Sequence, residues 1–304
     1  MSRSGRQFTL RFQDQAAVIT EVGATLREYR AAGRPLIDGF LATERSRDGR
    51  GQVLLPWPNR IDGGKYRFAG ADQQLPLNEV EHGNAIHGLA RWVPWTLQEV
   101  SDSSVTLSLV IAPQPGYDHI LVSKVEYRLS DLGLTAKVQA TNRGQEEIPF
   151  GVGFHPYLLI PGSPVDGLDL LVPATLRFQA DARGIPLGDP VVVAGSEFDF
   201  TARRRIGRVQ LDTTFTGLVR SEAGMAEVRL TDRTSQRGVR LWCDQSLPYL
   251  QVFTGDTLAD PTVRRRSLAV EPMSCPPNAF RSGRDLVILE PGASYSASWG
   301  LAAI

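Results

Sequence analysis

The segment LVSKVEYRLSDLGLTAKVQATN, residues 121–142, decides the fold class of this chain. In its first half, apolar residues such as Leu121, Val125 and Tyr127 alternate with polar or charged ones. The second half repeats the alternation, and the turn sequence SDLG separates the two halves. Because successive side chains of a strand point to opposite faces, a period of two predicts two half-buried strands joined by a turn.

The same pattern recurs along the chain, for example in SSVTLSLVI at 103–111 and ASYSASWG at 293–300. Turn sequences such as QPGYD, NRGQ and EPGAS separate these segments at roughly ten-residue spacing. Convincing helical stripes, interdomain linkers and internal repeats are absent from the sequence. We therefore predict an all-β chain, a single domain over residues 1–304 built as a large antiparallel β-sandwich.

Composition excludes several classes of protein. The chain has 304 residues, 33 basic and 33 acidic, and a formal net charge of zero. Such a balance predicts no field that would gather nucleic acid or a membrane surface. The N-terminus has no apolar segment typical of a signal peptide, and no stretch approaches the length of a membrane span. We expect a cytoplasmic protein, monomeric or homodimeric, that acts on a small molecule.

The sequence offers no signature of a metal or cofactor. Its two cysteines, Cys243 in a strand-like segment and Cys275 in a turn, cannot form a disulfide framework and are expected to be reduced thiols. Paired spacings such as CxxC or HxxxH, typical of zinc sites, are missing, as are the P-loop, the Rossmann glycines and GxSxG. We therefore expect neither a metal nor a cofactor.

Two polar residues interrupt strongly apolar segments. His155 lies in PFGVGFHPYLLI at 149–160, and Glu271 ends a predicted strand in SLAVEP. Each precedes a proline, which favours extended backbone. His155 alone is also compatible with a hydrogen-bonded core histidine. Together, an imidazolium that donates a proton and a carboxylate that accepts one predict acid/base chemistry without a nucleophile, provided that their pKa values are tuned in opposite directions.

Each further candidate for a binding residue also has a purely structural interpretation. Arg60 follows Asn59 in LLPWPNRID and is either an ion-pair partner or a ligand-binding residue. Asp212 follows a predicted strand in VQLDTTFTGL and is either a turn acceptor or a binding residue. His87, in NAIHGLARWVPW, either fills a turn or faces a ligand. Trp57 either packs in the core or against a sugar face.

Two arginine clusters, 203–205 and 264–266, also have two interpretations. Each is either a solvated loop or strand end, or a subsite for an anionic substrate.

The ordered motifs resemble the aldose 1-epimerase (mutarotase) family. Residues 58–88, PNRIDGGKYRFAGADQQLPLNEVEHGNAIHG, resemble its N-R-I, hairpin, L-x-x-N and H-G signature. Four later blocks follow in the family's order: GVGFHPYL at 151–158, LDTTFTGL at 211–218, LPYLQVFTGD at 247–256 and LAVEPMSCPPNAF at 268–280. The resemblance runs from about residue 10 to the C-terminus. It implies a galactose mutarotase-like supersandwich that interconverts sugar anomers without a cofactor.

Carried over by motif, the resemblance assigns a role to each candidate. Glu271 would be the general base and His155 the general acid. Substrate-binding residues would be Arg60, His87, Asp212, Gln251 and Asn59.

One departure affects substrate preference. Segment 149–160 lacks the polar Asn and Thr that galactose mutarotases tend to carry before this histidine, so galactose specificity does not follow. Three alternatives stay open: a neutral hexose, an anionic sugar such as a hexose 6-phosphate or sulfoquinovose, and a non-catalytic carbohydrate-binding sandwich. An anionic sugar would need additional cations, for which Arg91 and Arg264 to Arg266 are available.

Overall fold

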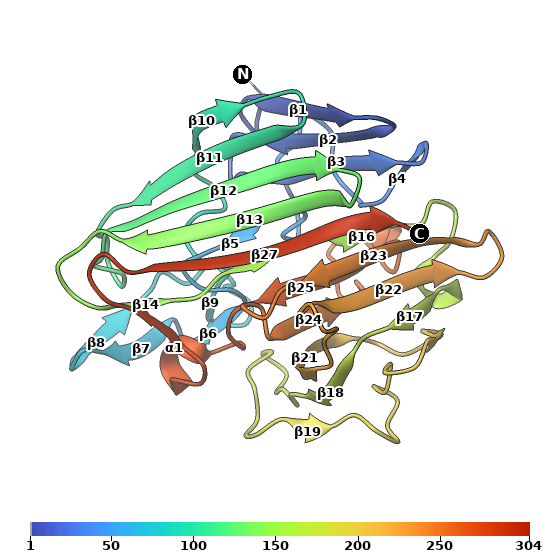
Figure 1. The fold of residues 1–304 in the computed structure, drawn as a ribbon. Helices are drawn as coiled ribbons and strands as arrows, with labels where there is room; N and C mark the ends of the chain where they lie inside the picture. The colour runs from blue at the N-terminus through green and yellow to red at the C-terminus, as the bar shows by residue number, and fades with distance from the viewer. Residues whose placement is uncertain (1) are drawn as a thin grey trace.

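A nine-stranded antiparallel sheet crosses the front of the molecule in the computed structural model, which describes residues 2–304 (Figure 1). In spatial order its strands are β10 (Thr96–Val100), β11 (Ser104–Ile111), β12 (Leu121–Ser130), β13 (Gly133–Asn142), β27 (Ser294–Ala303), β23 (Arg237–Cys243), β22 (Ala226–Asp232), β17 (Asp169–Leu171) and β20 (Arg204–Arg205). The sheet contains both strands predicted from residues 121–142, paired in antiparallel register from Leu121↔Asn142 to Ser130↔Gly133.

An eight-stranded sheet forms the second layer. Its strands, in order, are β19 (Val191–Val192), β18 (Ala174–Arg177), β21 (Asp212–Leu218), β24 (Tyr249–Phe253), β25 (Leu268–Met273), β15 (Gly153–Phe154) and β5 (Val53–Leu54), with β16 (Tyr157–Leu158) also paired to β25. These pairings are antiparallel as well. The predicted all-β antiparallel sandwich is thereby confirmed.

Smaller sheets and short helices complete the fold. They are the four-stranded sheet β1 (Gln7–Phe12), β2 (Gln15–Thr20), β3 (Leu26–Ala31) and β4 (Arg34–Pro35), the pairs β14 (Ile148–Phe150) with β26 (Val287–Leu289), β6 (Arg60–Asp62) with β9 (Asn84–Ile86) and β7 (Lys65–Phe68) with β8 (Ala71–Gln74), and the helices η1 (Val165–Gly167), η2 (Pro261–Val263) and α1 (Ala279–Ser282). Within residues 2–304, no helix has the length and apolar composition needed to cross a membrane.

The buried face of the long sheet follows the alternation in the sequence. In β12 the buried residues include Leu121, Val125 and Tyr127, whereas Lys124 and Arg128 are exposed. Across the core, the ring of Trp299 in β27 lies 5.3 Å from that of Phe154 in β15, and both are almost fully buried. This contact joins the long sheet to the strand that leads into the candidate site.

Two expectations about local structure are corrected. Asp212 does not follow a strand but begins β21, and Glu271 does not end a strand but lies inside β25. Of the two alternatives for Trp57, the structure favours the core, because Trp57 is 2% exposed and packs edge-on against Phe280. The two cysteines are free and buried, with Cys243 at the end of β23.

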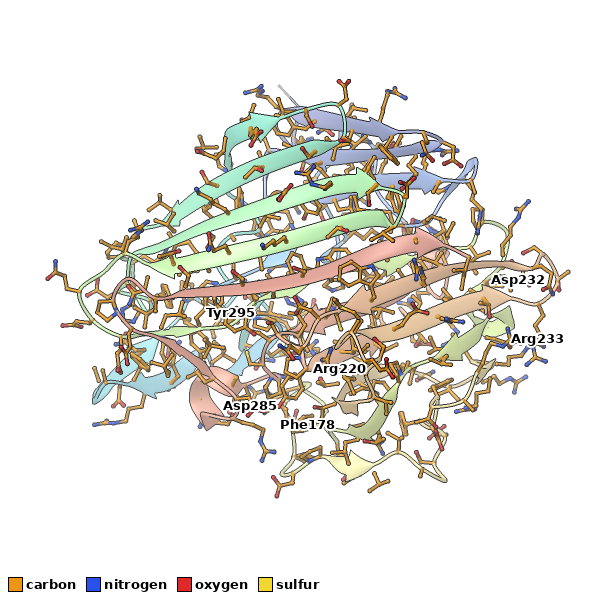
Figure 2. All side chains as sticks on the ribbon, viewed as in Figure 1. Phe178, Arg220, Asp232, Arg233, Asp285 and Tyr295 are labelled. Atoms are coloured by element: carbon orange, nitrogen blue, oxygen red, sulfur yellow. The ribbon has the colours of Figure 1, made fainter. Side chains whose placement is uncertain are left out.

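Two arginines labelled in Figure 2, Arg220 and Arg233, join neighbouring segments through polar contacts. Arg220 donates hydrogen bonds of 3.1 Å each to the carbonyl oxygens of Gly224, Cys243 and Leu247. Arg233 donates to the carboxylate of Asp169, which has no exposed surface. Oδ2 of the buried Asp169 is thus paired, whereas its Oδ1 has no hydrogen-bond partner among the described residues.

Truncation of the inter-sheet contact should destabilise the protein. We expect Trp299→Ala to lower the free energy of unfolding by about 3–5 kcal/mol, because it opens a cavity between the sheets. Val110→Ala, in the exposed part of β11, is the matched control and should change it by less than about 0.5 kcal/mol. Urea denaturation followed by fluorescence measures both, and equal effects would contradict the assignment of this contact to the core.

Candidate active site

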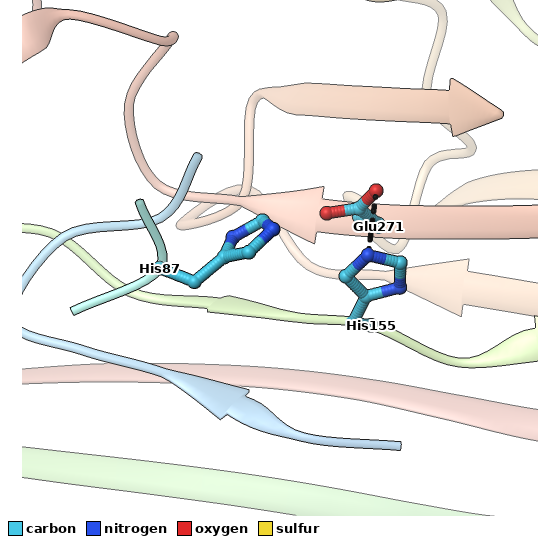
Figure 3. A group of neighbouring side chains, drawn as sticks. All are labelled: His87, His155 and Glu271. Carbon is cyan, nitrogen blue, oxygen red and sulfur yellow. Dashed lines mark ion pairs between the residues drawn. The ribbon is translucent and has the colours of Figure 1, made fainter. Parts of the chain in front are cut away.

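An imidazole and a carboxyl group face each other in the interior of the eight-stranded sheet (Figure 3). His155 lies in the two-residue link between β15 and β16, and Glu271 lies in the neighbouring strand β25. Nε2 of His155 is 3.3 Å from Oε1 of Glu271, and the residues are 5% and 3% exposed. Nδ1 of His155 and Oε2 of Glu271 are buried without a hydrogen-bond partner among the described residues. Unpartnered buried polar atoms of this kind are typical of a site that awaits a ligand.

Two neighbours fix the orientation of the His155 ring. Tyr157 stacks on it, with ring centroids 5.1 Å apart and planes 11° from parallel. Gly49 packs against its edge and has a left-handed backbone φ of +79°. A Cβ atom at this position would come within 2.4 Å of Cδ2 of the imidazole. Only glycine combines that backbone conformation with such a close approach.

Strand register places a row of polar side chains beside the pair. Thr214 of β21 is opposite Gln251 of β24, which is in turn opposite Glu271 of β25. Thr214 donates its hydroxyl hydrogen to Oε1 of Gln251, and Nε2 of Gln251 donates to the carboxylate of Asp212. The amide of Gln251 is therefore held in one orientation between its two neighbours.

His87 is locked to the loop that precedes Arg60. Both His87 and Asn59 have left-handed backbone, with φ of +63° and +52°. The backbone N–H of His87 donates to the carbonyl of Asn59 at 2.9 Å, and the N–H of Asn59 donates to Nδ1 of His87 at 3.2 Å. Since Nδ1 accepts, the ring proton of neutral His87 lies on Nε2. His87 lines the same cavity as His155, with ring centroids 5.3 Å apart.

The three residues of Figure 3 also form the group best placed to hold a metal. One ligand atom each from His87, His155 and Glu271 lie within 4.8 Å of one another. Two imidazoles and a carboxylate are a common ligand set for zinc and iron. In this tautomer, however, neither nitrogen of His87 offers a free lone pair, because Nδ1 accepts the Asn59 N–H and Nε2 carries the proton. The donor set therefore fits hydrogen bonding better than metal ligation.

Arg60 lines the same cavity as His87 and His155. Its guanidinium binds both carboxylate oxygens of Glu79 at 2.9–3.0 Å and lies 4.0 Å from Oδ2 of Asp212. Glu79 is thus the ion-pair partner that one alternative for Arg60 required, yet Arg60 also lines the cavity. The pair holds a charged group in place without closing its access to a ligand.

Burial acts on the protonation of the central pair. It is the largest cause that raises the pKa of Glu271 well above its usual value, and the negative charge of Asp212 adds to it. Burial also lowers the pKa of His155 to about 3, with a further contribution from the positive charge of Arg91. The expected imidazolium–carboxylate pair is therefore not the form that the empty site favours. Both shifts favour the neutral pair, in which the carboxyl group holds the proton.

The predicted residues surround two adjoining cavities. Six of the seven line one of about 450 Å³: Asn59, Arg60, His87, His155, Asp212 and Glu271. The seventh, Gln251, lines a second cavity of about 710 Å³, which shares Asn59, Arg60 and Asp212 with the first. The structure thus brings all seven predicted residues together in one region.

The arginine clusters are engaged elsewhere. Arg264 donates to the carbonyl of Leu258, Arg265 binds Asp256 at 2.8 Å, and Arg266 binds Asp38 at 2.7 Å. These contacts favour a structural role over an anion subsite.

In the other cluster, Arg204 donates to the carbonyl of Asp199 and lies over the ring of Phe200. This arrangement likewise favours the interpretation as a loop and strand end.

Sequence reasoning missed four residues that shape the site. Gly49, Glu79, Tyr157 and Thr214 position the side chains that were predicted. Glu79, Tyr157 and Thr214 were inside quoted motifs but had no role assigned to them, whereas Gly49 was outside every motif. Gly49, Glu79 and Thr214 act through contacts between segments far apart in the chain. No local pattern could have indicated those contacts.

Comparison with known proteins identifies the family. The sequence profile described as Aldose 1-epimerase matches residues 6–301. The chain is 37% identical over 296 residues to Uncharacterized protein YihR of Escherichia coli K12, covering 97% of this chain and 92% of YihR. It is 28% identical over 257 residues to Uncharacterized protein YphB of the same strain, covering 82% and 81%.

Solved structures share the fold at low sequence identity. A GalM/aldose epimerase homologue from C. elegans superposes with a TM-score of 0.87 at 19% identity, covering 98% of each chain. A galactose 1-epimerase from Lactobacillus acidophilus gives 0.82 at 21% identity, covering 97% of this chain and 93% of that one. With a family profile that spans almost the whole chain and a relative of 37% identity, the protein belongs to the aldose 1-epimerase family.

Proposed function

We propose that this protein is an aldose 1-epimerase, which interconverts the α and β anomers of a free hexose. The observation that carries the proposal is the buried His155–Glu271 pair, 3.3 Å apart, in a cavity lined by hydrogen-bonding side chains. In a pyranose, the anomeric hydroxyl and the ring oxygen are bonded to the same carbon. An acid and a base side by side match two oxygens that lie side by side.

The reaction needs one proton at each end of the breaking bond. Glu271 takes the proton of the anomeric hydroxyl while His155 gives a proton to the ring oxygen, and the C1–O5 bond breaks. The open aldehyde rotates about C1–C2 and recloses with the two roles reversed. Before ring opening in this direction, the single proton of the neutral pair moves from Glu271 to His155. After ring opening, His155 has given that proton to the ring oxygen, and Glu271 carries the proton taken from the anomeric hydroxyl.

The remaining residues bind and orient the sugar. Arg60, Asn59 and Nε2–H of His87 supply donors at the cavity wall, and Asp212 supplies acceptors. Gln251, held by its neighbours, presents a fixed amide edge. Fixed polar groups of this kind hold a substrate near its reactive geometry without reorganisation.

The alternative of a non-catalytic carbohydrate-binding sandwich has no specific observation in its favour. It would leave the burial of an unpartnered imidazole nitrogen and carboxylate oxygen without a use. Binding of a sugar without acceleration of anomer exchange would nevertheless establish it.

Removal of either member of the pair should abolish catalysis. We expect Glu271→Gln and His155→Gln each to lower kcat by about 10²–10⁴-fold, the usual contribution of a general acid or base. Magnetisation-transfer NMR on glucose and galactose measures the exchange above its spontaneous rate. His119→Gln is the control and should retain activity, because His119 packs against Phe68 and Tyr117 and lines neither cavity. Wild-type rates in either test variant would disprove these roles, provided that thermal melting shows a folded protein.

The pH profile should reflect a pair that works with one proton. The low pKa of His155, about 3, keeps the second proton off at pH 5, where an unperturbed imidazole with pKa about 6.5 would be charged. We therefore expect kcat/KM to be maintained from pH 7 down to pH 5. It should fall as pH rises through the raised pKa of Glu271, because the pair then loses its only proton.

The variant Asp212→Asn tests whether the alkaline limb of the pH profile depends on the charge beside Glu271. Removal of the negative charge beside Glu271 makes its carboxylate easier to form, so the alkaline limb should move to lower pH. A profile that falls below pH 7 with an inflection near 6.5 would contradict the neutral pair.

The contact of Gly49 with the catalytic imidazole can be tested separately. Gly49→Ala should lower kcat by at least about tenfold, because its Cβ displaces the ring of His155. Gly70→Ala is the matched control, since Gly70 has a similar φ of +83° but nothing within 4 Å of its Cβ position. Both carry the same backbone penalty, so equal losses of activity would show that the contact is unimportant.

A further inference from the structure

Arg91 is a buried cation without a carboxylate partner. It is 9% exposed, and no ion pair is formed by its guanidinium within residues 2–304. Its hydrogen bonds go to neutral oxygens, the carbonyl of Ile86 at 3.2 Å and Oε1 of Gln52 at 3.5 Å, and its Nε has no acceptor. An arginine has five N–H donors, so three stay unused. Burial of such a charge is unfavourable unless a partner arrives.

Other buried arginines near the cavity differ from Arg91 in this respect. Arg50 binds Asp38 and Asp48, and Arg60 binds Glu79. The positive charge of each is therefore balanced within the protein. No carboxylate among the described residues forms an ion pair with Arg91, although its side chain is about as little exposed as those of Arg50 and Arg60.

Arg91 lines the same cavity as the acid/base pair. His155 and His87 line this cavity too, and after burial the charge of Arg91 is the largest cause that lowers the pKa of both imidazoles. Trp92 follows it in the chain, lines the same cavity and is half exposed, with the guanidinium 5.4 Å from its ring centroid. An aromatic face beside a fork of N–H donors forms a recognisable site for a planar or tetrahedral anion.

We propose that Arg91 is a subsite for a single negative charge on the sugar, a carboxylate or sulfonate carried at C6. The inference rests on the proposed function for its orientation. His155 gives its proton to the ring oxygen, and C6 is attached to the other carbon bonded to that oxygen, C5. A substituent at C6 thus lies near His155, in the cavity that Arg91 also lines.

The charges of the cavity favour a monoanion over a dianion. One uncompensated guanidinium balances one negative charge, and the low pKa of His155 and of His87 leaves both imidazoles neutral. The other guanidinium that lines the cavity, that of Arg60, is already paired with Glu79, and Asp212 adds a carboxylate to the lining. The second charge of a phosphate ester would therefore find no further unpaired cation among the described residues of this cavity.

Binding of unreactive analogues tests the subsite apart from catalysis. The probes are 1,5-anhydroglucitol, which has no anomeric hydroxyl and cannot open, and its C6 derivatives with a carboxylate, a sulfonate or a phosphate group. Calorimetric titration of the wild-type protein should give a Kd about 10- to 100-fold lower for a monoanionic derivative than for the neutral parent, as expected for charge-assisted hydrogen bonds. The phosphate derivative should bind more weakly than the better of the two monoanions.

Variants assign the preference to one side chain. Arg91→Met should reduce the ratio of anionic to neutral affinity to near one, and Arg91→Lys should retain part of it because the charge remains without the fork. Arg45→Gln is the matched control, since Arg45 is an exposed arginine near the same Trp92 ring and should leave the ratio unchanged. Thermal melting checks that each variant is folded.

The outcomes separate this inference from the proposed function. Equal wild-type affinity for neutral and anionic analogues, tightest binding of the phosphate, or a preference retained in Arg91→Met would each overturn the subsite. Exchange measured by NMR on glucose and on its C6 carboxylate and sulfonate analogues tests catalysis separately. Selective binding of a monoanionic analogue without anomer exchange would refute the proposed epimerase activity and support the subsite. Anomer exchange without selective binding would support the epimerase activity and refute the subsite.

Discussion

Burial of an imidazole and a carboxyl group 3.3 Å apart is unfavourable, and the surrounding fold must offset that free energy. The offset comes in part from protonation, because both pKa shifts favour a neutral pair that needs no solvation of charge. The same burial removes competing water from the groups that would transfer protons. The electrostatic cost of His155 and Glu271 and their proposed chemical use thus have one origin.

Strand pairing is what makes this burial reproducible. Glu271 and Gln251 occupy opposite positions on adjacent strands, and Thr214 continues the row on the next strand. A slip of one residue would turn each of these side chains to the other face of the sheet. On the other side of the cavity, left-handed backbone at Asn59 and His87 performs the equivalent task without regular structure. Positions in the site are therefore set by backbone geometry more than by side-chain packing.

Much of this arrangement was accessible from the sequence, and the reasons are specific. Alternation in residues 121–142 predicted two strands because a half-buried sheet imposes a period of two. His155 and Glu271 were detectable because polar residues in apolar segments are costly without a use. The protonation of the pair was not predictable, since it depends on burial and on charges from distant segments. For the same reason the contact between Gly49 and His155 left no trace in local sequence.

The lining of the larger cavity includes a loop segment that is absent from the lining of the smaller cavity. Residues of the 178–186 segment, which follows β18, line it together with Gln251 of β24. Loops tolerate insertion and substitution far better than paired strands do. Changes in this segment would alter how bulky a molecule the protein admits and leave the strands beneath it untouched. Substrate range and reaction chemistry can consequently diverge at separate rates during evolution of this lineage.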